Sequence, residues 1–279
     1  MGMSKTAPVI SAIHAHDGVA LDGLPMMRIR RRHSGLRVTI RRVTRQLILL
    51  VSALILSAAS LAAAADVRNL SMRLPDGREV LYGLSLPDGY QAGQPRPLVL
   101  ALHPGGQRMR YYGSAYTKAV VGPAVTTLNA IVVAPDCPSA SWADAASDSA
   151  VMALLERVMQ EYAVDRRRVL VVGFSMGGRG TWFMAAHHRD LFTAAIPMAA
   201  SIGEPVETLA TMPTYVIHSR RDQVVPFSPA EQNVQALERL GRTIKFDALN
   251  DLTHYDMVDY VPALRRGVTW VSAQWNAAR

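Results

Sequence analysis

Cysteine is nearly absent from this 279-residue chain, which contains only Cys137. A single thiol excludes an intrachain disulfide framework and a cysteine-rich zinc module. Charged residues are few, at 19%, and aromatic residues make up 6%, whereas hydrophobic residues make up 49%. This composition excludes a disordered chain, a collagen and a coiled coil, and the length is enough for one large domain or two small ones.

Acidic residues are scarce in the first 65 positions, which hold 9 Lys and Arg but only 2 Asp and Glu. Residues 66–279 hold 21 basic and 20 acidic residues, so the formal net charge of +8 belongs almost entirely to the N-terminal segment. Because the rest of the chain carries almost no basic excess, the sequence argues against nucleic-acid binding.

Residues 1–65 contain the three parts of an export signal. Eight arginines lie between Arg28 and Arg45, and the uncharged run Leu47–Ala65 ends in closely spaced alanines. This order predicts a secretory signal peptide cleaved near Ala65, and hence a secreted or periplasmic protein. The alternative is an uncleaved anchor, since nineteen uncharged residues are long enough to span a bilayer. In that case this segment would be the membrane contact of the protein.

Residues 66–279 have the pattern of a doubly wound α/β domain with a mostly parallel sheet. Two alternating segments flank Pro75-Asp76-Gly77 and predict an antiparallel hairpin at a sheet edge. The continuously apolar runs that follow are typical of parallel strands covered on both faces. Helical patterns separate them, including Ser147–Tyr162 and a stretch from the capping box Ser228-Pro229-Ala230-Glu231 to Gly241. The predicted strands are Asn69–Leu74, Glu79–Leu84, Pro97–Leu102, Ala130–Ala134, Val169–Val172, Ala194–Met198, Thr214–Ile217 and Ile244–Leu249.

Ser175 is the predicted nucleophile. It is the serine of Gly173-Phe174-Ser175-Met176-Gly177, which is the one G-x-S-x-G in the chain and lies between an apolar strand and a helix-compatible run. Such a nucleophile elbow lifts the serine oxygen above the sheet, and small residues beside the serine avoid the neighbouring strand and helix. The alternative is a glycine-rich turn without a catalytic role.

A serine hydroxyl needs a histidine base that a carboxylate orients, and in this architecture the chain order is Ser, acid, His. His254 is the one histidine after Asp222, and both residues follow predicted strands. We therefore expect Asp222 and His254 on the same rim of the sheet as Ser175. A turn or a helix cap is the alternative role of Asp222.

The remaining candidates receive supporting roles. Three aspartates lie too near His254 in sequence to be the acid of the preceding strand. His218 is expected to support the Asp222 loop, and the two histidines after the elbow are expected at a helix end or on the surface. These residues are Asp247, Asp251 and Asp256, and His187 and His188.

Acyl transfer also needs backbone N–H groups that bind the oxyanion. One is expected from Met176, the residue after the nucleophile. The other is expected from Gly105 or Gly106, which follow a buried strand and allow close approach of the backbone, with Gln107 nearby at the substrate. His103, at the start of this loop, is expected to shape the loop and not to act as a base.

The motifs LHPGG, VVAPDCPSASW, DRRRVLVVGFSMGGRGTW, HSRRDQVVP and LTHYD occur in this order. The order resembles the α/β-hydrolase superfamily, and within it secreted prolyl-oligopeptidase-like esterases, including feruloyl-esterase-like and polyhydroxybutyrate-depolymerase-like proteins. The resemblance covers nearly all of residues 66–279. It implies a catalytic domain that cleaves small-molecule carboxylic esters through Ser175, Asp222 and His254, without a metal or organic cofactor.

The resemblance has further implications for substrate binding. Cys137 and Trp142 match a P-x-C-P…W segment of the family, which places Trp142 at the border of the substrate cleft, while Cys137 is alternatively a small buried hydrophobe. The sequence contains no obvious long insertion for a lid, which favours small or aryl acyl groups. Side chains of the loop after the Pro97–Leu102 strand are expected to stack on an aryl ring or meet a carboxylate, or else to pack the loop. They are Arg108, Arg110, Tyr111, Tyr112 and Tyr116.

Two other functions remain open from the sequence. The same triad serves serine peptidases and acyl-aminoacyl hydrolases, although no propeller domain is evident. A catalytically silent binding protein on this scaffold is the other alternative, and the intact triad argues against it.

Overall fold

The computed structural model describes residues 66–106 and 109–278. The predicted signal segment (1–65), the predicted substrate-binding residue Gln107 and the loop residue Arg108 lie outside the described residues. Within the described part of the chain, no helix is long and apolar enough to cross a bilayer.

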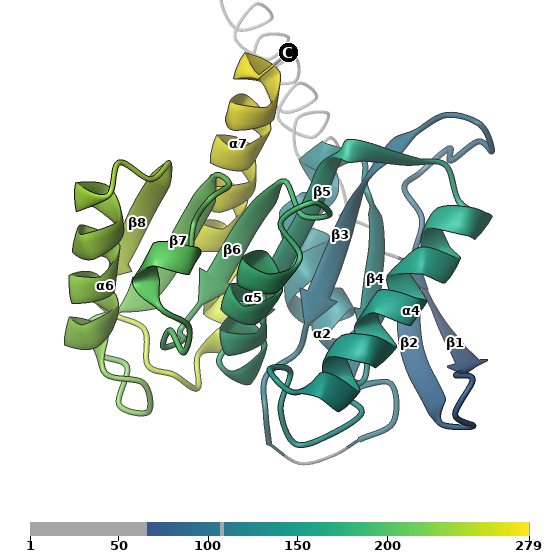
Figure 1. Cartoon of the computed structure of the whole chain (residues 1–279), viewed down its shortest axis with the longest axis horizontal. Coiled ribbons are helices and arrows are strands. Elements are labelled where there is room, and N and C mark those ends of the chain that lie inside the picture. Colours follow the sequence, from purple (N-terminus) through teal and green to yellow (C-terminus); the bar gives the residue numbers. More distant parts are fainter. Residues whose placement is uncertain (1–65, 107–108, 279) are drawn as a thin grey trace, which may run out of the picture. The chain divides into compact units, whose positions relative to one another are not determined.

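An eight-stranded mixed sheet organises the described region (Figure 1). The strand order is β1-β2-β4-β3-β5-β6-β7-β8, with β1–β2 and β2–β4 antiparallel and every other pair parallel. This is the predicted α/β-hydrolase architecture with its N-terminal hairpin. The strands are β1 (Val67–Arg73), β2 (Glu79–Ser85), β3 (Arg96–Leu102), β4 (Ile131–Pro135), β5 (Val164–Phe174), β6 (Ala194–Met198), β7 (Thr214–Ser219) and β8 (Ile244–Leu249).

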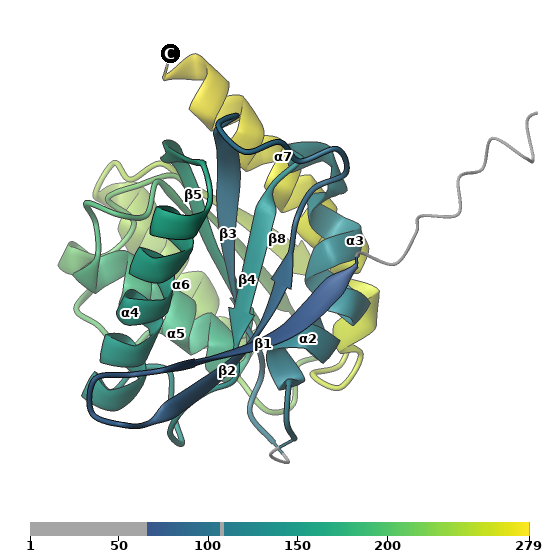
Figure 2. The ribbon, with the colours of Figure 1, turned by 90° about the vertical axis from the view of Figure 1, so that its right-hand side faces the viewer.

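Helices cover both faces of the sheet (Figures 1 and 2). Helices α4, α5 and α6 pack their apolar side chains on one face, and α2, α3 and α7 pack on the other. The α-helices are α2 (Tyr112–Tyr116), α3 (Gly122–Val125), α4 (Ala145–Glu161), α5 (Met176–His187), α6 (Phe227–Arg239) and α7 (Val261–Ala277). Short 3-10 and π turns are η1 (Thr117–Val121), η2 (Thr126–Leu128), η3 (Val206–Thr208) and η4 (Met257–Tyr260).

Strand β5 is longer than the sequence predicted. It begins at Val164, whose backbone pairs with Arg96 of β3, whereas the prediction began at Val169. The extra residues include Arg166 and Arg167, whose side chains are exposed. Pairing of the backbone, and not burial of the side chains, extends the strand. A search for apolar runs therefore does not detect the part of β5 that precedes Val169.

The predicted capping box of α6 is wrong. The helix begins at Phe227, two residues before the Pro229 start that a Ser228 cap requires, and no side chain caps it. Ser228 therefore lies inside the first turn, where its own backbone is already helical. The predicted stop is correct, because Gly241 follows the helix with φ +69°, a left-handed conformation that glycine adopts without steric cost.

Candidate active site

The nucleophile elbow forms between β5 and α5. Ser175 has φ 55° and ψ −115°, an unfavourable conformation for a residue with a side chain, and its N–H donates to the Met198 carbonyl at 2.9 Å. A Cβ on Gly177 would lie 1.8 Å from the Leu102 oxygen, and one on Gly173 would lie 2.2 Å from the Gly177 oxygen. Glycine at position 173 lets the end of β5 approach α5, and glycine at position 177 lets α5 approach β3.

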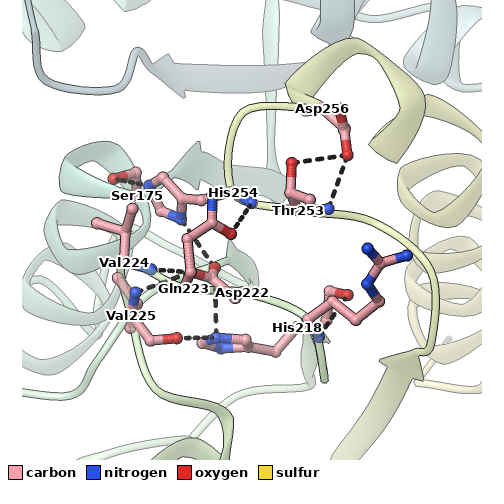
Figure 3. A network of polar contacts seen from close by, with 11 residues as sticks. Ser175, His218, Asp222, Gln223, Val224, Val225, Thr253, His254 and Asp256 are labelled. Carbon is pink, nitrogen blue, oxygen red and sulfur yellow. Dashed lines mark hydrogen bonds and ion pairs between the residues drawn. The ribbon is translucent and has the colours of Figure 1, made fainter.

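Ser175, His254 and Asp222 form a continuous hydrogen-bonded chain (Figure 3). Ser175 Oγ lies 2.8 Å from His254 Nε2, and His254 Nδ1 lies 2.8 Å from Asp222 Oδ2. The carboxylate is an acceptor, so Nδ1 carries the proton and Nε2 accepts from the serine hydroxyl. This is the tautomer in which the imidazole can remove the serine proton.

Asp222 is fixed by the turn that it begins. Its Oδ1 accepts from the N–H groups of Val224 at 2.9 Å and Val225 at 2.8 Å, and its side chain is fully buried. Two amides occupy one carboxylate oxygen, which leaves Oδ2 for His254. His218, at the end of β7, lies below this turn, as Figure 3 shows, and its Nε2 is 2.9 Å from the Val225 carbonyl oxygen.

The loop after β8 carries His254 and is closed by a local turn. Asp256 Oδ2 accepts from both the N–H and the hydroxyl of Thr253 at 2.7 Å, and these bonds hold the pKa of Asp256 below its ordinary value. The His254 N–H donates to Gln223 Oε1 at 3.3 Å, which joins this loop to the Asp222 turn. Phe174 packs beside the imidazole with ring centroids 5.2 Å apart.

The glycine loop after β3 lies against the residue that follows the nucleophile. A Cβ on Gly105 would lie 3.5 Å from both Cβ and Sδ of Met176, and Gly106 has φ +120°. The main chain of this loop therefore lies beside the side chain of Met176, the first residue of α5. The structure brings together Ser175, Met176 and the Gly105–Gly106 loop, which the sequence analysis selected separately.

His103 holds this loop in place. Its Nε2 accepts from the Cys137 N–H at 3.0 Å, and its Nδ1 lies 2.6 Å from the Pro104 carbonyl oxygen. Burial lowers the pKa of His103, so the neutral ring, with a proton on Nδ1, fits both contacts. His103 thus has the loop-shaping position that the sequence predicted, away from the serine.

Comparison with known proteins identifies the family. A family model described as PETase, PET hydrolase-like, matches residues 108–256, which include Ser175, Asp222 and His254. The chain belongs to the PET hydrolase-like family.

This PET hydrolase-like chain is also similar to curated esterases. It is 28% identical over 162 residues to feruloyl esterase C of Emericella nidulans and 26% identical over 170 residues to a probable feruloyl esterase C of Aspergillus niger. Each alignment covers 54% of this chain and 57% of the relative, so the chain spans little more than half the length of these relatives.

Solved structures share the fold of this PET hydrolase-like chain. A thermostable esterase is 25% identical with a TM-score of 0.66, and the match covers 75% of this chain and 63% of that one. A ferulic acid esterase superposes with a TM-score of 0.62 at 18% identity, over 74% of this chain and 98% of that one. At 18% identity, the second likeness is evidence for the fold alone.

Trp142 does not lie at the border of the cleft, where the resemblance placed it. Its side chain is fully buried, and its indole N–H donates to the His103 carbonyl at 2.9 Å. The ring also packs edge-on against the His103 ring, with centroids 5.1 Å apart. Trp142 therefore supports the Gly105–Gly106 loop from behind, through His103, and does not line the cavity beside that loop.

A cavity of about 420 Å³ lies beside the Gly105–Gly106 loop of this PET hydrolase-like chain. Tyr112 contributes its ring to the wall, whereas Tyr116 is buried in the core and so packs the loop. Cys137 also lines it, and burial raises the pKa of this thiol. The lining residues are Leu81, His103, Pro104, Gly105, Gly106, Met109, Arg110, Tyr112, Asp136, Cys137, Ser139, Ala140 and Met176.

Sequence reasoning missed Asp136, the residue that shapes the cavity wall. Its carboxylate accepts from the Tyr111 N–H at 2.6 Å and from the Gly113 N–H at 2.9 Å, and so fixes the start of α2. An aspartate directly after a strand was the available signal, but its partners lie 23 and 25 residues earlier in the chain. Among the described residues, no group of three or more His, Cys, Asp or Glu side chains is arranged to hold a metal ion.

Proposed function

We propose that this protein is a serine hydrolase that cleaves carboxylic esters, with Ser175 as nucleophile, His254 as general base and Asp222 as the orienting acid. The observation that carries the proposal is the pair of 2.8 Å contacts that link Asp222 through His254 to Ser175 on a strained elbow. Membership of the PET hydrolase-like family and similarity to feruloyl esterases support the same reaction class.

In the first half-reaction, Ser175 Oγ attacks the ester carbonyl carbon while its proton passes to His254 Nε2. The carbonyl oxygen becomes an oxyanion, which the N–H groups of Met176 and of Gly105 or Gly106 stabilise. When the bond to the alcohol oxygen breaks, the alcohol leaves with the proton from His254, and the acyl group remains on Ser175.

In the second half-reaction, water replaces the alcohol. His254 Nε2 takes one proton from the water as its oxygen attacks the acyl carbon. The bond between this carbon and Ser175 Oγ then breaks, and Oγ regains the proton from His254. A carboxylic acid is released and the free enzyme is restored, so no cofactor enters the balance.

The proposed substrates are esters with small or aryl acyl groups. A cavity of about 420 Å³ beside Met176 is large enough for an aromatic ring, and Tyr112 and the thioethers of Met109 and Met176 favour such a ring. Exposed apolar side chains lie on the loops around the triad and would contact the rest of a large ester. They include Val224 beside Asp222 and Tyr255 beside His254, the latter 77% exposed.

Covalent labelling tests the proposed nucleophile. A fluorophosphonate should label the native protein once, at Ser175, and should not label the Ser175→Ala variant. A Ser201→Ala variant is the matched control, because Ser201 is an exposed serine outside the triad, and it should be labelled like the native protein. Absence of labelling in the native protein would favour a catalytically silent scaffold.

A substrate panel tests the reaction class and acyl preference. We expect kcat/KM to be higher for p-nitrophenyl acetate and butyrate than for p-nitrophenyl palmitate, and methyl ferulate should be hydrolysed as well. A higher value for palmitate would contradict the small or aryl acyl pocket. Cleavage of p-nitroanilides in preference to the matching esters would favour a peptidase.

A further inference from the structure

A second histidine lies beneath the proposed triad and takes no part in the steps above. His218 is the penultimate residue of β7, and its side chain has no solvent exposure. Its Nε2 lies 2.9 Å from the Val225 carbonyl oxygen and 3.6 Å from Asp222 Oδ2. This buried imidazole is therefore close enough to act on the turn that carries the proposed acid.

The contacts determine which nitrogen of His218 carries the proton. The Val225 carbonyl is an acceptor only, so Nε2–H donates to it. Nδ1 is buried and has no hydrogen-bond partner among the described residues, so a second proton there would have no acceptor. Burial lowers the pKa of His218, in agreement with a neutral ring.

Val225 connects His218 to Asp222. The Val225 carbonyl accepts from His218, while the Val225 N–H donates to Asp222 Oδ1 at 2.8 Å. The peptide groups around this residue thus tie the Asp222 turn to the rigid end of β7. Loss of the His218 bond would loosen one of the two amides that occupy Oδ1, and the carboxylate would then be held less firmly in the orientation that faces His254.

Few other groups act on the His218 ring. Asp222 faces it from the turn, His254 acts on it from the loop after β8, and the Phe227 ring of α6 stands edge-on with centroids 5.9 Å apart. Phe227 in turn stacks on Phe246 of β8 with centroids 5.4 Å apart. These rings help to exclude water from the Val225 contact, and an unscreened hydrogen bond holds its geometry more firmly.

We infer that His218 is a positioning residue for the proposed reaction: as a neutral Nε2–H donor to the Val225 carbonyl, it holds the 222–225 turn so that Asp222 presents Oδ2 to His254. The inference rests on the proposed function. It goes beyond the triad, because it assigns the alignment of the acid to a hydrogen bond that touches neither the substrate nor the serine.

Two substitutions at His218 test its hydrogen-bond donor separately from the volume of its ring. Glutamine places its amide nitrogen near the position of Nε2 and keeps a donor, whereas leucine keeps apolar bulk without one. We expect His218→Leu to lower kcat for p-nitrophenyl acetate on the order of 10- to 100-fold with KM within about twofold, and His218→Gln to recover most of the loss. His188→Gln is the matched control away from the site and should behave like the native protein.

The split between kcat and KM gives a readout that simple destabilisation would not move. A misaligned carboxylate hinders the proton transfer from Ser175 to His254 but leaves the binding of the ester unchanged, so the loss in His218→Leu should fall on kcat and not on KM. His218→Gln should recover most of that loss. Equal losses of kcat in both variants would overturn the inference.

A double-mutant cycle tests whether His218 acts through Asp222. The readout is the rate constant of fluorophosphonate labelling, which remains measurable in slow variants. His218→Leu should slow labelling in the native background but have little further effect in an Asp222→Ala background. The same slowing in both backgrounds would overturn the inference. Absence of labelling in the native protein would instead refute the proposed function.

A third variant covers the case in which His218→Leu does not fold. In His218→Asn the amide nitrogen lies near the position of Nδ1 and cannot reach the Val225 carbonyl. We expect it to lose activity while His218→Gln keeps it, with both variants melting at similar temperatures. Equal activity of the Asn and Gln variants would contradict the role of the Nε2 donor.

Discussion

Ser175 shows at the scale of one residue how strain is held in place. Its φ of 55° is sparsely populated for a residue with a side chain and costs on the order of 1–3 kcal/mol. Backbone bonds on both sides offset this cost, since the Ser175 N–H donates to Met198 and its carbonyl accepts from the Arg179 N–H, both at 2.9 Å. The hydroxyl is thereby directed toward His254 and not into the core.

Alanine substitutions test the proposed roles within the triad. Ser175→Ala or His254→Ala should reduce kcat on the order of 10⁴- to 10⁶-fold, and Asp222→Asn somewhat less, because the oxyanion hole still acts in every variant. Ester hydrolysis by purified variants measures the effect, and circular dichroism checks that each is folded. Full activity of Asp222→Ala would show that another group orients the base.

The connection between β3 and α2 is the element that carries Gly105 and Gly106, the glycines of the proposed oxyanion hole. Its first half is held by His103, which contacts Cys137 after β4, and its second half by Asp136, which binds the backbone at Tyr111 and Gly113. Trp142 supports it from behind. Two side chains from the β4–α4 connection, those of Asp136 and Trp142, and the backbone N–H of Cys137 thus shape a loop that a different part of the chain supplies.

Burial of neutral His103 makes this element sensitive to acid. Its pKa is lowered in the folded state, so below about pH 6.5 the unfolded chain binds more protons than the folded one. The free energy of unfolding must therefore fall as the pH drops. We expect His103→Gln to reduce this loss between about pH 7.5 and about pH 5, as measured by urea denaturation.

His187→Gln is the matched control for the acid effect, because His187 is exposed at the end of α5. Its unfolding free energy should follow that of the native protein at both pH values. An undiminished loss of stability in His103→Gln would show that other groups, such as buried His218, carry the acid sensitivity.

Close contact between β3 and α5 depends on Gly177. A Cβ there would lie 1.8 Å from the Leu102 oxygen, which belongs to the main chain and cannot move aside. Gly177→Ala should therefore lower the free energy of unfolding by more than the roughly 1–3 kcal/mol that is typical of overpacking, or prevent folding altogether. Urea denaturation would measure this loss. Gly105→Ala is the control, since its Cβ would meet Met176 atoms only at 3.5 Å.

At the scale of the whole molecule, the parallel strands deliver all parts of the site to one rim of the sheet. Ser175 follows β5, Asp222 follows β7, His254 follows β8 and Gly105 follows β3, each at the carboxyl end of its strand. The order of strands across the sheet then places the Gly105–Gly106 loop on one side of Ser175 and the proposed acid and base on the other.

Export remains a prediction for the whole molecule. If the basic and apolar segments form a cleaved signal, mass spectrometry of material secreted by an expressing bacterium should find an N-terminus close to Asp66. Replacing the leucines and isoleucines of the apolar run by serine should retain the full-length chain inside the cell. A full-length product recovered from the membrane fraction would favour the anchor.

The sequence by itself determined the features that depend on neighbours along the chain. The G-x-S-x-G pattern selected Ser175, the order Ser, acid, His selected Asp222 and His254, and Pro75-Asp76-Gly77 gave the hairpin. Each is a local or ordinal signal, because turn geometry and strand order follow from the residues in sequence. Apolar runs predicted the strands for the same reason, and this method failed where charged residues extend β5.

Only the tertiary structure decided which groups hold these residues in position. Burial of Trp142, the amides at Val224 and Val225 and the contact of His218 with Val225 come from the packing of loops against one another. His254 and Ser175 are 79 residues apart in the chain, yet their side chains lie 2.8 Å apart. Such distances depend on how strands and helices pack, and packing is set by many weak contacts that no single segment of sequence contains.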